Sequence, residues 1–267
     1  MNRFLQMLML LWWSMYGTEA PAIIFGQDVE HSSTNASASV VALQMPEIQP
    51  DGSTHYYKGS AFLIAPNLLL TAGHNLAYIP DPTQVEVIFS STPCWGPNTC
   101  HEKRVKVAKA VVHPQFHQVE GGTEFDLAIV KLEANAPDDY RTIPLIDEKE
   151  TLEANLLHVF GFGLDHDVAN VPLSAFRLRT IALSALEPNY ILGSKQKFWL
   201  DQSNGGICGG DSGGPSILVN GSSSVAIGLA IHVTYSDGVS HCLTKSAFTD
   251  LKFFKNWIDS VLNAILR

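Results

Sequence analysis

The 267-residue sequence predicts an all-β protein, a sandwich or a barrel, with a single α-helix at its C-terminus. Between residues 23 and 231, short apolar runs rich in β-branched and aromatic residues alternate with turns that contain Gly, Pro, Asn and Asp. From Asp250 onward, apolar residues recur at three- and four-residue spacing, which is typical of an amphipathic helix of about four turns.

Each of the apolar runs has the length of one strand and is bounded by turn signals. They cover residues 61–64, 68–72, 85–89, 105–112, 127–132, 156–160, 176–183, 216–219 and 225–231. A polar stretch that contains proline, 133–144, is suited to join two halves of similar size. We therefore expect one half at 23–138 and another, with the terminal helix, at 139–267.

The composition is that of a folded chain, with 46% hydrophobic and 16% charged residues. A net charge of −9 argues against nucleic-acid binding and leaves no basic patch for anionic membranes. We expect no nucleic-acid partner, no stable membrane insertion, no metal and no cofactor, and we expect a monomer.

Residues 1–22 resemble an export signal. Arg3 precedes an apolar segment, 5–16, which is shorter than the roughly 20 residues that span a membrane. Ala20-Pro21-Ala22 fits the small-x-small rule, so cleavage would leave Ile23 at the new N-terminus. The alternative is an uncleaved N-terminal anchor. The first interpretation predicts a secreted protein, either extracellular or periplasmic.

The four cysteines are consistent with export, and their number allows three pairings. Cys94 and Cys100 bracket a turn-like Trp-Gly-Pro run and could close a local loop. Cys208 and Cys242 would then close a longer loop. Neither pair has the spacing of zinc ligands.

A serine in CGGDSGGPS, residues 208–216, raises a chemical question because four glycines surround it. A serine hydroxyl is a poor nucleophile unless a base and an orienting group activate it. His74 follows an apolar strand among small residues, and Asp126 lies near the start of the apolar run FDLAIVKL, where an unpaired carboxylate would be costly. Taken singly, these residues also fit a loop-edge histidine, a strand-start cap and a turn.

Together, the three segments resemble the trypsin–chymotrypsin family of serine peptidases. They are GSAFLIAPNLLLTAGH at 59–74, DLAIVKL at 126–132 and GDSGGP at 210–215. The resemblance covers the chain from Ile23 to the terminal helix. It implies two packed six-stranded antiparallel β-barrels and a secreted serine endopeptidase that cleaves protein or peptide substrates.

The resemblance also implies the role of each site residue. Ser212 would be the nucleophile, His74 the base and Asp126 the group that orients it, with an oxyanion hole formed by the N–H groups of Gly210 and Ser212. The free amine of Ile23 would pair with Asp211. Cys208 and Cys242 match the family's disulfide near the specificity pocket.

The expected substrate-binding residues depart from the family pattern. They are Gly206, Ile207, Ile231, His232, Val233 and Ser246. Gly206, at the floor of the pocket, carries no charge, and Val233 narrows the entrance, so we expect a small or medium neutral residue before the cut. Ile231 replaces a serine whose hydroxyl supports the aspartate, which leaves the support of Asp126 open. Asn75 and Gly59 stand where animal members have a disulfide.

Two other functions compete with this interpretation. The pattern Gly-x-Ser-x-Gly also occurs in α/β-hydrolases, but there a helix follows the serine, whereas 215–219 resembles a strand. An inactive homologue that binds proteins is the second alternative, which the presence of all three catalytic residue types disfavours. His113 and His117 have a spacing that could bind a metal, although we expect solvated loops there.

Overall fold

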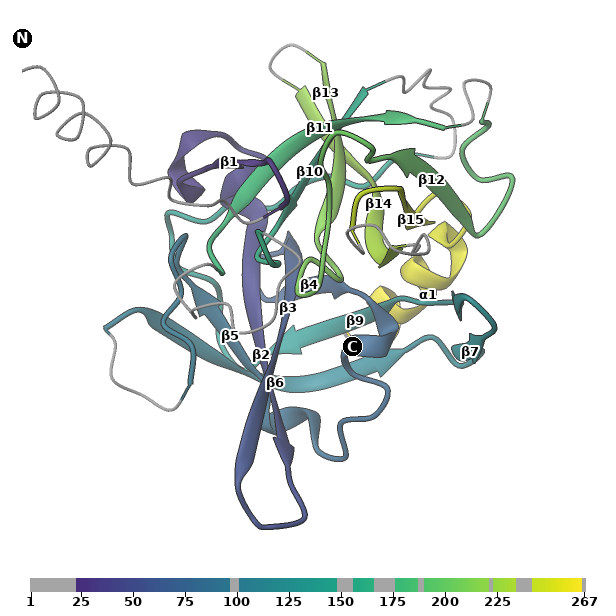
Figure 1. The fold of residues 1–267 in the computed structure, drawn as a ribbon. Helices are drawn as coiled ribbons and strands as arrows, with labels where there is room; N and C mark the ends of the chain where they lie inside the picture. The colour runs from purple at the N-terminus through teal and green to yellow at the C-terminus, as the bar shows by residue number, and fades with distance from the viewer. Residues whose placement is uncertain are drawn as a thin grey trace, which may run out of the picture.

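The computed structural model describes residues 23–96, 101–147, 156–165, 176–186, 190–220, 223–233 and 242–265. Within these ranges the chain forms two closed six-stranded antiparallel barrels and one α-helix (Figure 1). The all-β class, the two barrels and the helix that the sequence predicts are confirmed. None of the helices in these ranges has the length and apolar character needed to cross a bilayer.

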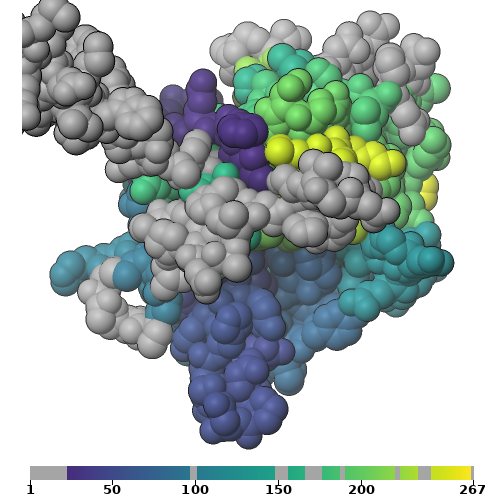
Figure 2. Space-filling model, in the orientation of Figure 1, coloured from purple at the N-terminus to yellow at the C-terminus, as the bar shows by residue number. Residues whose placement is uncertain are grey.

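The first barrel pairs its strands in the order β2-β3-β4-β9-β6-β5. They are β2 (Val40–Ile48), β3 (Thr54–Ala65), β4 (Leu68–Thr71), β5 (Glu86–Phe89), β6 (Lys103–Val112) and β9 (Ala128–Leu132). A short hairpin of β7 (His117–Val119) and β8 (Gly122–Glu124) precedes β9. The ends of β2 and β3 project from the barrel as the blue lobe in Figure 2.

The second barrel pairs in the order β11-β10-β13-β14-β15-β12 and closes where β12 meets β11. Its strands are β10 (Leu156–Gly161), β11 (Arg179–Ala185), β12 (Lys197–Asp201), β13 (Pro215–Asn220), β14 (Ser223–Val233) and β15 (Lys245–Asp250). Strand β1 (Gln27–Asp28) pairs with β11, so the segment that precedes the first barrel lies on the second. Four short 3₁₀ turns complete the described elements: η1 (His31–Ser33), η2 (Ser37–Ser39), η3 (Gly73–Asn75) and η4 (Pro82–Gln84).

The cores explain why the strands show apolar runs rather than strict alternation. Along β2, Val41 and Leu43 belong to the cluster that fills the first barrel. Val40 and Ala42, on the other face, belong to a cluster that includes residues of the second barrel such as Phe160. Because both faces of the strand are buried, alternation between apolar and polar residues is lost.

The C-terminal helix α1 spans Lys255–Ile265, so the prediction of a helix from Asp250 was wrong about its start. Asp250 ends β15, and its Oδ1 accepts N–H groups from Lys252 at 2.9 Å and Phe253 at 3.2 Å. These bonds hold a turn before the helix begins. The end of α1 reaches the first barrel, where Nζ of Lys131 donates to the carbonyl oxygen of Ile265 at 3.1 Å.

Candidate active site

Ser212 lies in the loop that leads into β13, and it is partly exposed. The next residue, Gly213, has a φ of +87°, and a side chain there would collide with the carbonyl oxygen of Ser60 and the hydroxyl of Thr71. Only glycine permits both this backbone conformation and this close approach. The glycine therefore lets the serine loop of the second barrel pack directly on strands of the first.

His74 and Asp126 come together because the strands beside them are paired. His74 lies in η3, just after β4, and Asp126 lies just before β9. Thr71 of β4 pairs with Ala128 of β9. Nδ1 of His74 lies 2.8 Å from Oδ2 of Asp126, and the backbone N–H of His74 donates to Oδ1 at 2.9 Å. Both carboxylate oxygens thus face the histidine.

The carboxylate of Asp126 is ionised although its side chain is fully buried. Burial opposes the charge, but hydrogen bonds and electrostatic attraction from His74 outweigh it, and they hold the pKa of Asp126 below its ordinary value. The hydroxyl of Thr123 adds a further hydrogen bond to Oδ2 at 2.5 Å. An ionised acid beside Nδ1 fixes which ring nitrogen carries the proton and stabilises the imidazolium form.

Thr123 is a residue that the sequence did not indicate. Ile231, which stands where the family has a serine, is buried and carries no hydroxyl. Thr123, on the β7–β8 hairpin, supplies a hydroxyl to Asp126 instead. The neighbour of Ile231, His232, has its pKa lowered by burial and then by the charges of Lys197 and His74.

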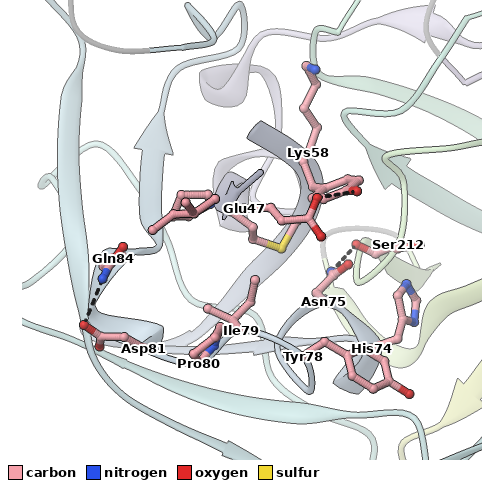
Figure 3. Close-up of a pocket in the computed structure, with 14 residues that line it drawn as sticks. Glu47, Lys58, His74, Asn75, Tyr78, Ile79, Pro80, Asp81, Gln84 and Ser212 are labelled. Carbon is pink, nitrogen blue, oxygen red and sulfur yellow. Dashed lines mark hydrogen bonds between the residues drawn. The ribbon is translucent and has the colours of Figure 1, made fainter. Parts of the chain in front are cut away.

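Ser212 and His74 both line a cleft of about 720 Å³ (Figure 3). The same cleft is bordered by the projecting part of the β2–β3 hairpin and by residues 78–81. Within the described part of the chain the Ser212 hydroxyl has no hydrogen-bond partner. In enzymes without bound substrate, the hydrogen bond between a hydroxyl nucleophile and its base is commonly long or poorly aligned, and it tightens only when substrate binds. The structure thus places the serine and the histidine on one accessible surface, with Asp126 behind the histidine.

The backbone at Gly210 and Ser212 presents two N–H groups that no described residue accepts. Gly210 has a φ of +98°, and its carbonyl accepts the hydroxyl of Ser60 at 3.0 Å. Among the described residues, neither the N–H of Gly210 nor that of Ser212 has an acceptor. Free N–H groups at such a position can stabilise negative charge on a bound oxygen.

Asp211, which stands between Gly210 and Ser212 in this loop, is completely buried. Its carboxylate accepts the N–H groups of Gly163 at 2.7 Å and Cys208 at 2.9 Å. Burial raises the pKa of Asp211 to about 7, and the two N–H groups and the charge of Arg179 only partly oppose this shift. Ile23 is buried too, and the pairing of its amine with Asp211 stays a prediction.

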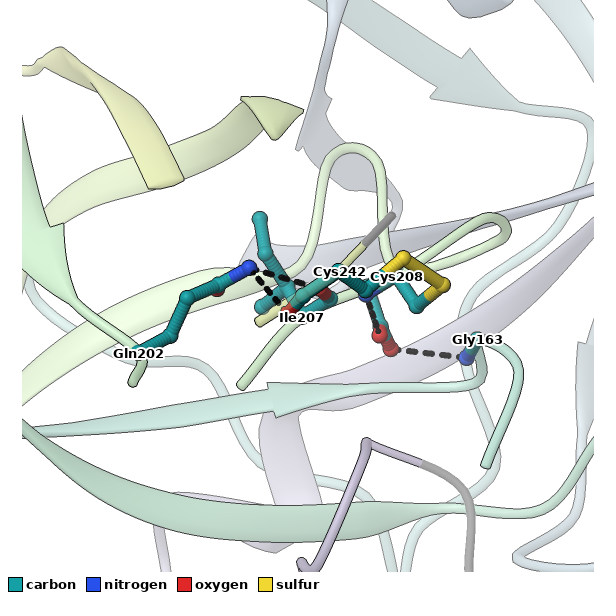
Figure 4. Close-up of a disulfide and its surroundings, with 6 residues drawn as sticks. Gly163, Gln202, Ile207, Cys208 and Cys242 are labelled. Carbon is teal, nitrogen blue, oxygen red and sulfur yellow. Dashed lines mark hydrogen bonds between the residues drawn. A yellow bond between two sulfur atoms is a disulfide. The ribbon is translucent and has the colours of Figure 1, made fainter. Parts of the chain in front are cut away.

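The residues predicted for the pocket gather in the second barrel. Gly206 pairs through its backbone with Ile24, and a side chain at Gly206 would collide with Gln202, whose amide donates to the carbonyls of Ile207 and Cys242 (Figure 4).

Val233 and Ser246, which are also predicted to line the pocket, are paired on β14 and β15. Val233 packs on the disulfide that joins Cys208 to Cys242. Gln202, which the sequence did not single out, supports this region through the hydrogen bonds of its amide to the carbonyls of Ile207 and Cys242.

Two other expectations concern residues away from the site. Cys100 lies outside the described residues, so the pairing of Cys94 with Cys100 stays a prediction. The expectation of a solvated loop at His113 was wrong, because His113 is buried between the rings of Phe125, Phe254 and Trp257. In the described ranges no cluster of His, Cys, Asp and Glu has a geometry that could hold a metal ion.

Comparison with known proteins finds relatives that match most of this chain. The mouse protein named tryptase is 26% identical over 224 residues, which cover 76% of this chain and 77% of the relative. The human chymotrypsin-like elastase family member 1 is 25% identical, with 79% of this chain and 83% of the relative covered. The chicken urokinase-type plasminogen activator is 24% identical, and only 50% of its length is covered. The family model described as Trypsin matches residues 28–258, and the chain therefore belongs to the trypsin family of serine proteases.

Proposed function

We propose that the protein is a secreted serine endopeptidase whose nucleophile is Ser212. The observation that carries this proposal is the bond between Nδ1 of His74 and the buried carboxylate of Asp126, with His74 and Ser212 on the same cleft. Nε2 of His74 accepts the proton of Ser212 as the hydroxyl attacks the substrate carbonyl, and later gives it to the leaving amine. Asp126 stays ionised throughout and stabilises the imidazolium.

The developing oxyanion is bound by the N–H groups of Gly210 and Ser212. Their lack of other acceptors within the described residues supports this role. Each such donor contributes about 3–4 kcal/mol to stabilising the transition state.

Hydrolysis of a peptide library tests the proposed activity and its specificity together. Gly206 has no charge, and Val233 and Ser246 are neutral, so we expect cleavage after small or medium neutral residues. Fragments identified by mass spectrometry would show the residue before each cut. Cleavage dominated by Arg or Lys would refute the specificity, and the absence of cleavage would favour a protein-binding homologue without activity.

Replacing Thr123 with valine should lower kcat, because valine keeps the shape of threonine but removes the hydroxyl that donates to Asp126. A hydrogen bond to a charged group contributes about 1.5–3 kcal/mol, so we expect a loss of roughly 10- to 100-fold. Steady-state kinetics on one peptide would measure it. An unchanged kcat would show that Asp126 needs no hydroxyl partner.

Removal of the export signal 1–22 is part of the proposal, and it would free the amine of Ile23 for Asp211. While Ile23 remains linked to Ala22, the carboxylate of Asp211 has no such partner. Its raised pKa means that the folded chain holds a proton that the unfolded chain has released. Stability should therefore fall as pH rises from about 4 to about 7, by about 4 kcal/mol.

Replacing Asp211 with asparagine should remove this slope in the uncleaved chain. Denaturant unfolding between pH 4 and 7 would measure it, in the Ser212→Ala background to prevent self-digestion. A chain that begins at Ile23 should also lose the slope, because the amine stabilises the ionised carboxylate. Equal slopes in all three proteins would contradict the pairing.

A further inference from the structure

The side chain of Asn75 joins the two barrels at the site. Asn75 directly follows His74 and is 8% exposed. Its Nδ2 donates to the hydroxyl oxygen of Thr71 at 3.0 Å. The same Nδ2 donates to the carbonyl oxygen of Ser212 at 2.9 Å (Figure 3). One side chain thus connects the turn that carries the histidine with the backbone of the serine.

The chemistry of its partners fixes the orientation of this amide. The carbonyl of Ser212 can only accept. The hydroxyl of Thr71 gives its own hydrogen to the carbonyl of Ser60 at 2.8 Å, so toward Asn75 it can only accept. Both partners therefore require the NH₂ group, and the two hydrogens of the amide are both used.

The strand opposite leaves room for this amide. A Cβ added to Gly59 would lie 2.9 Å from Nδ2 of Asn75 and 3.1 Å from Cε of Met45. Because both contacts are closer than ordinary packing allows, any larger residue at this buried position of β3 would displace the amide. Gly59 and Asn75 form a matched pair in which the absence of one side chain makes space for the other.

The bond completes the support of the Ser212 carbonyl. That oxygen also accepts the N–H of Ser60 at 2.9 Å, so its two lone pairs are both occupied by donors from the first barrel. We propose that Asn75 is a positioning residue that sets the backbone of Ser212 relative to His74. This inference rests on the proposed function, since it matters only if these two side chains exchange a proton. A displacement of about 1 Å between such groups costs roughly 100-fold in rate.

The test is the rate at which a fluorophosphonate phosphonylates Ser212 with loss of fluoride, measured together with kcat and KM for one peptide. For Asn75→Ala we expect a phosphonylation rate and a kcat about 10- to 100-fold lower. KM should change less than about twofold, because the hydrogen bonds of the Asn75 amide go to Thr71 and Ser212 and not to the residues predicted for the specificity pocket. The rates are measured well below the melting temperature. Each rate is divided by the number of molecules that carry the label when the reaction is complete, so that a loss of folded protein does not affect it.

Two further variants separate positioning from simple stabilisation. Asn67→Ala makes the same chemical change in the turn at the other end of β4, where the side chain has no partner among the described residues, and this variant should be phosphonylated at the wild-type rate. Gly59→Ala should slow phosphonylation in the wild-type chain but cause no further loss when Asn75 is already alanine. This non-additivity is expected only if Gly59 acts through the amide.

The outcomes distinguish a failure of the proposed function from a failure of the inference about Asn75. A wild-type chain that the fluorophosphonate does not label would overturn the proposed function and this inference with it. A labelled wild type together with an Asn75→Ala variant that is phosphonylated at a rate within twofold of it would overturn the inference alone. Additive losses from Gly59→Ala and Asn75→Ala would also overturn it, because the two residues would then act separately.

Discussion

Replacing Ser212 with alanine should abolish peptide hydrolysis and leave the fold intact. The hydroxyl makes no hydrogen bond within the described part of the chain, so its removal breaks none. The loop is held by its backbone, in which the N–H of Gly213 donates to Ala230 at 2.7 Å and that of Gly214 to Asp211 at 2.8 Å. Loss of the nucleophile should lower kcat by about 10⁴- to 10⁶-fold. Peptide hydrolysis and thermal unfolding of the variant would measure both effects.

Ser203→Ala is a matched control, because it makes the same change in an exposed turn of the second barrel. It should hydrolyse the peptide at the wild-type rate. If Ser212→Ala kept more than about a hundredth of the wild-type kcat while its melting temperature stayed unchanged, Ser212 would not be the nucleophile.

Replacing Asp126 with asparagine should have the second-largest effect, a fall in kcat of about 10⁴-fold. Asp126 accepts the N–H at Nδ1 of His74, which leaves Nε2 free to receive a proton. Because an asparagine amide can donate to Nδ1, it would favour the tautomer that is protonated at Nε2. The imidazole could then no longer act as the base toward Ser212.

The size of the fall can be measured from kcat at neutral pH, with the melting temperature as a check on folding. Asp201→Asn, in which the aspartate lies at a partly exposed end of β12, is the control and should leave kcat unchanged. A loss of less than about tenfold in Asp126→Asn would mean that the carboxylate does not control the protonation of His74.

The short sequence segments around His74, Asp126 and Ser212 predicted the fold and these three site residues, and there is a physical reason for this. A glycine-rich loop around a serine is needed where a backbone packs as closely as Gly213 does on Ser60 and Thr71. An aspartate at the start of a buried strand needs partners, and the structure supplies His74. Such requirements are local, so the sequence alone records them.

Side-chain contacts that depend on the folded geometry could not be predicted in this way. Thr123 lies only three residues before Asp126, but it is the β7–β8 hairpin that turns its hydroxyl toward the carboxylate. The role of Asn75 depends on a carbonyl 137 positions away in the sequence. His113 is polar, which suggested a solvated loop. The rings of Phe125, just before β9, and of Trp257, in α1, nevertheless pack against it. The start of α1 was missed because Asp250 ends a strand and closes a turn by tertiary context rather than by periodicity.

Labelling with a fluorophosphonate, followed by mass spectrometry of the digested protein, tests most directly whether Ser212 is an activated nucleophile. We expect a single adduct on the peptide that contains Ser212, with labelling absent in Ser212→Ala and slowed by at least about 10³-fold in His74→Ala. No adduct on the folded protein, an adduct on another residue, or equal labelling of the His74→Ala variant would contradict it.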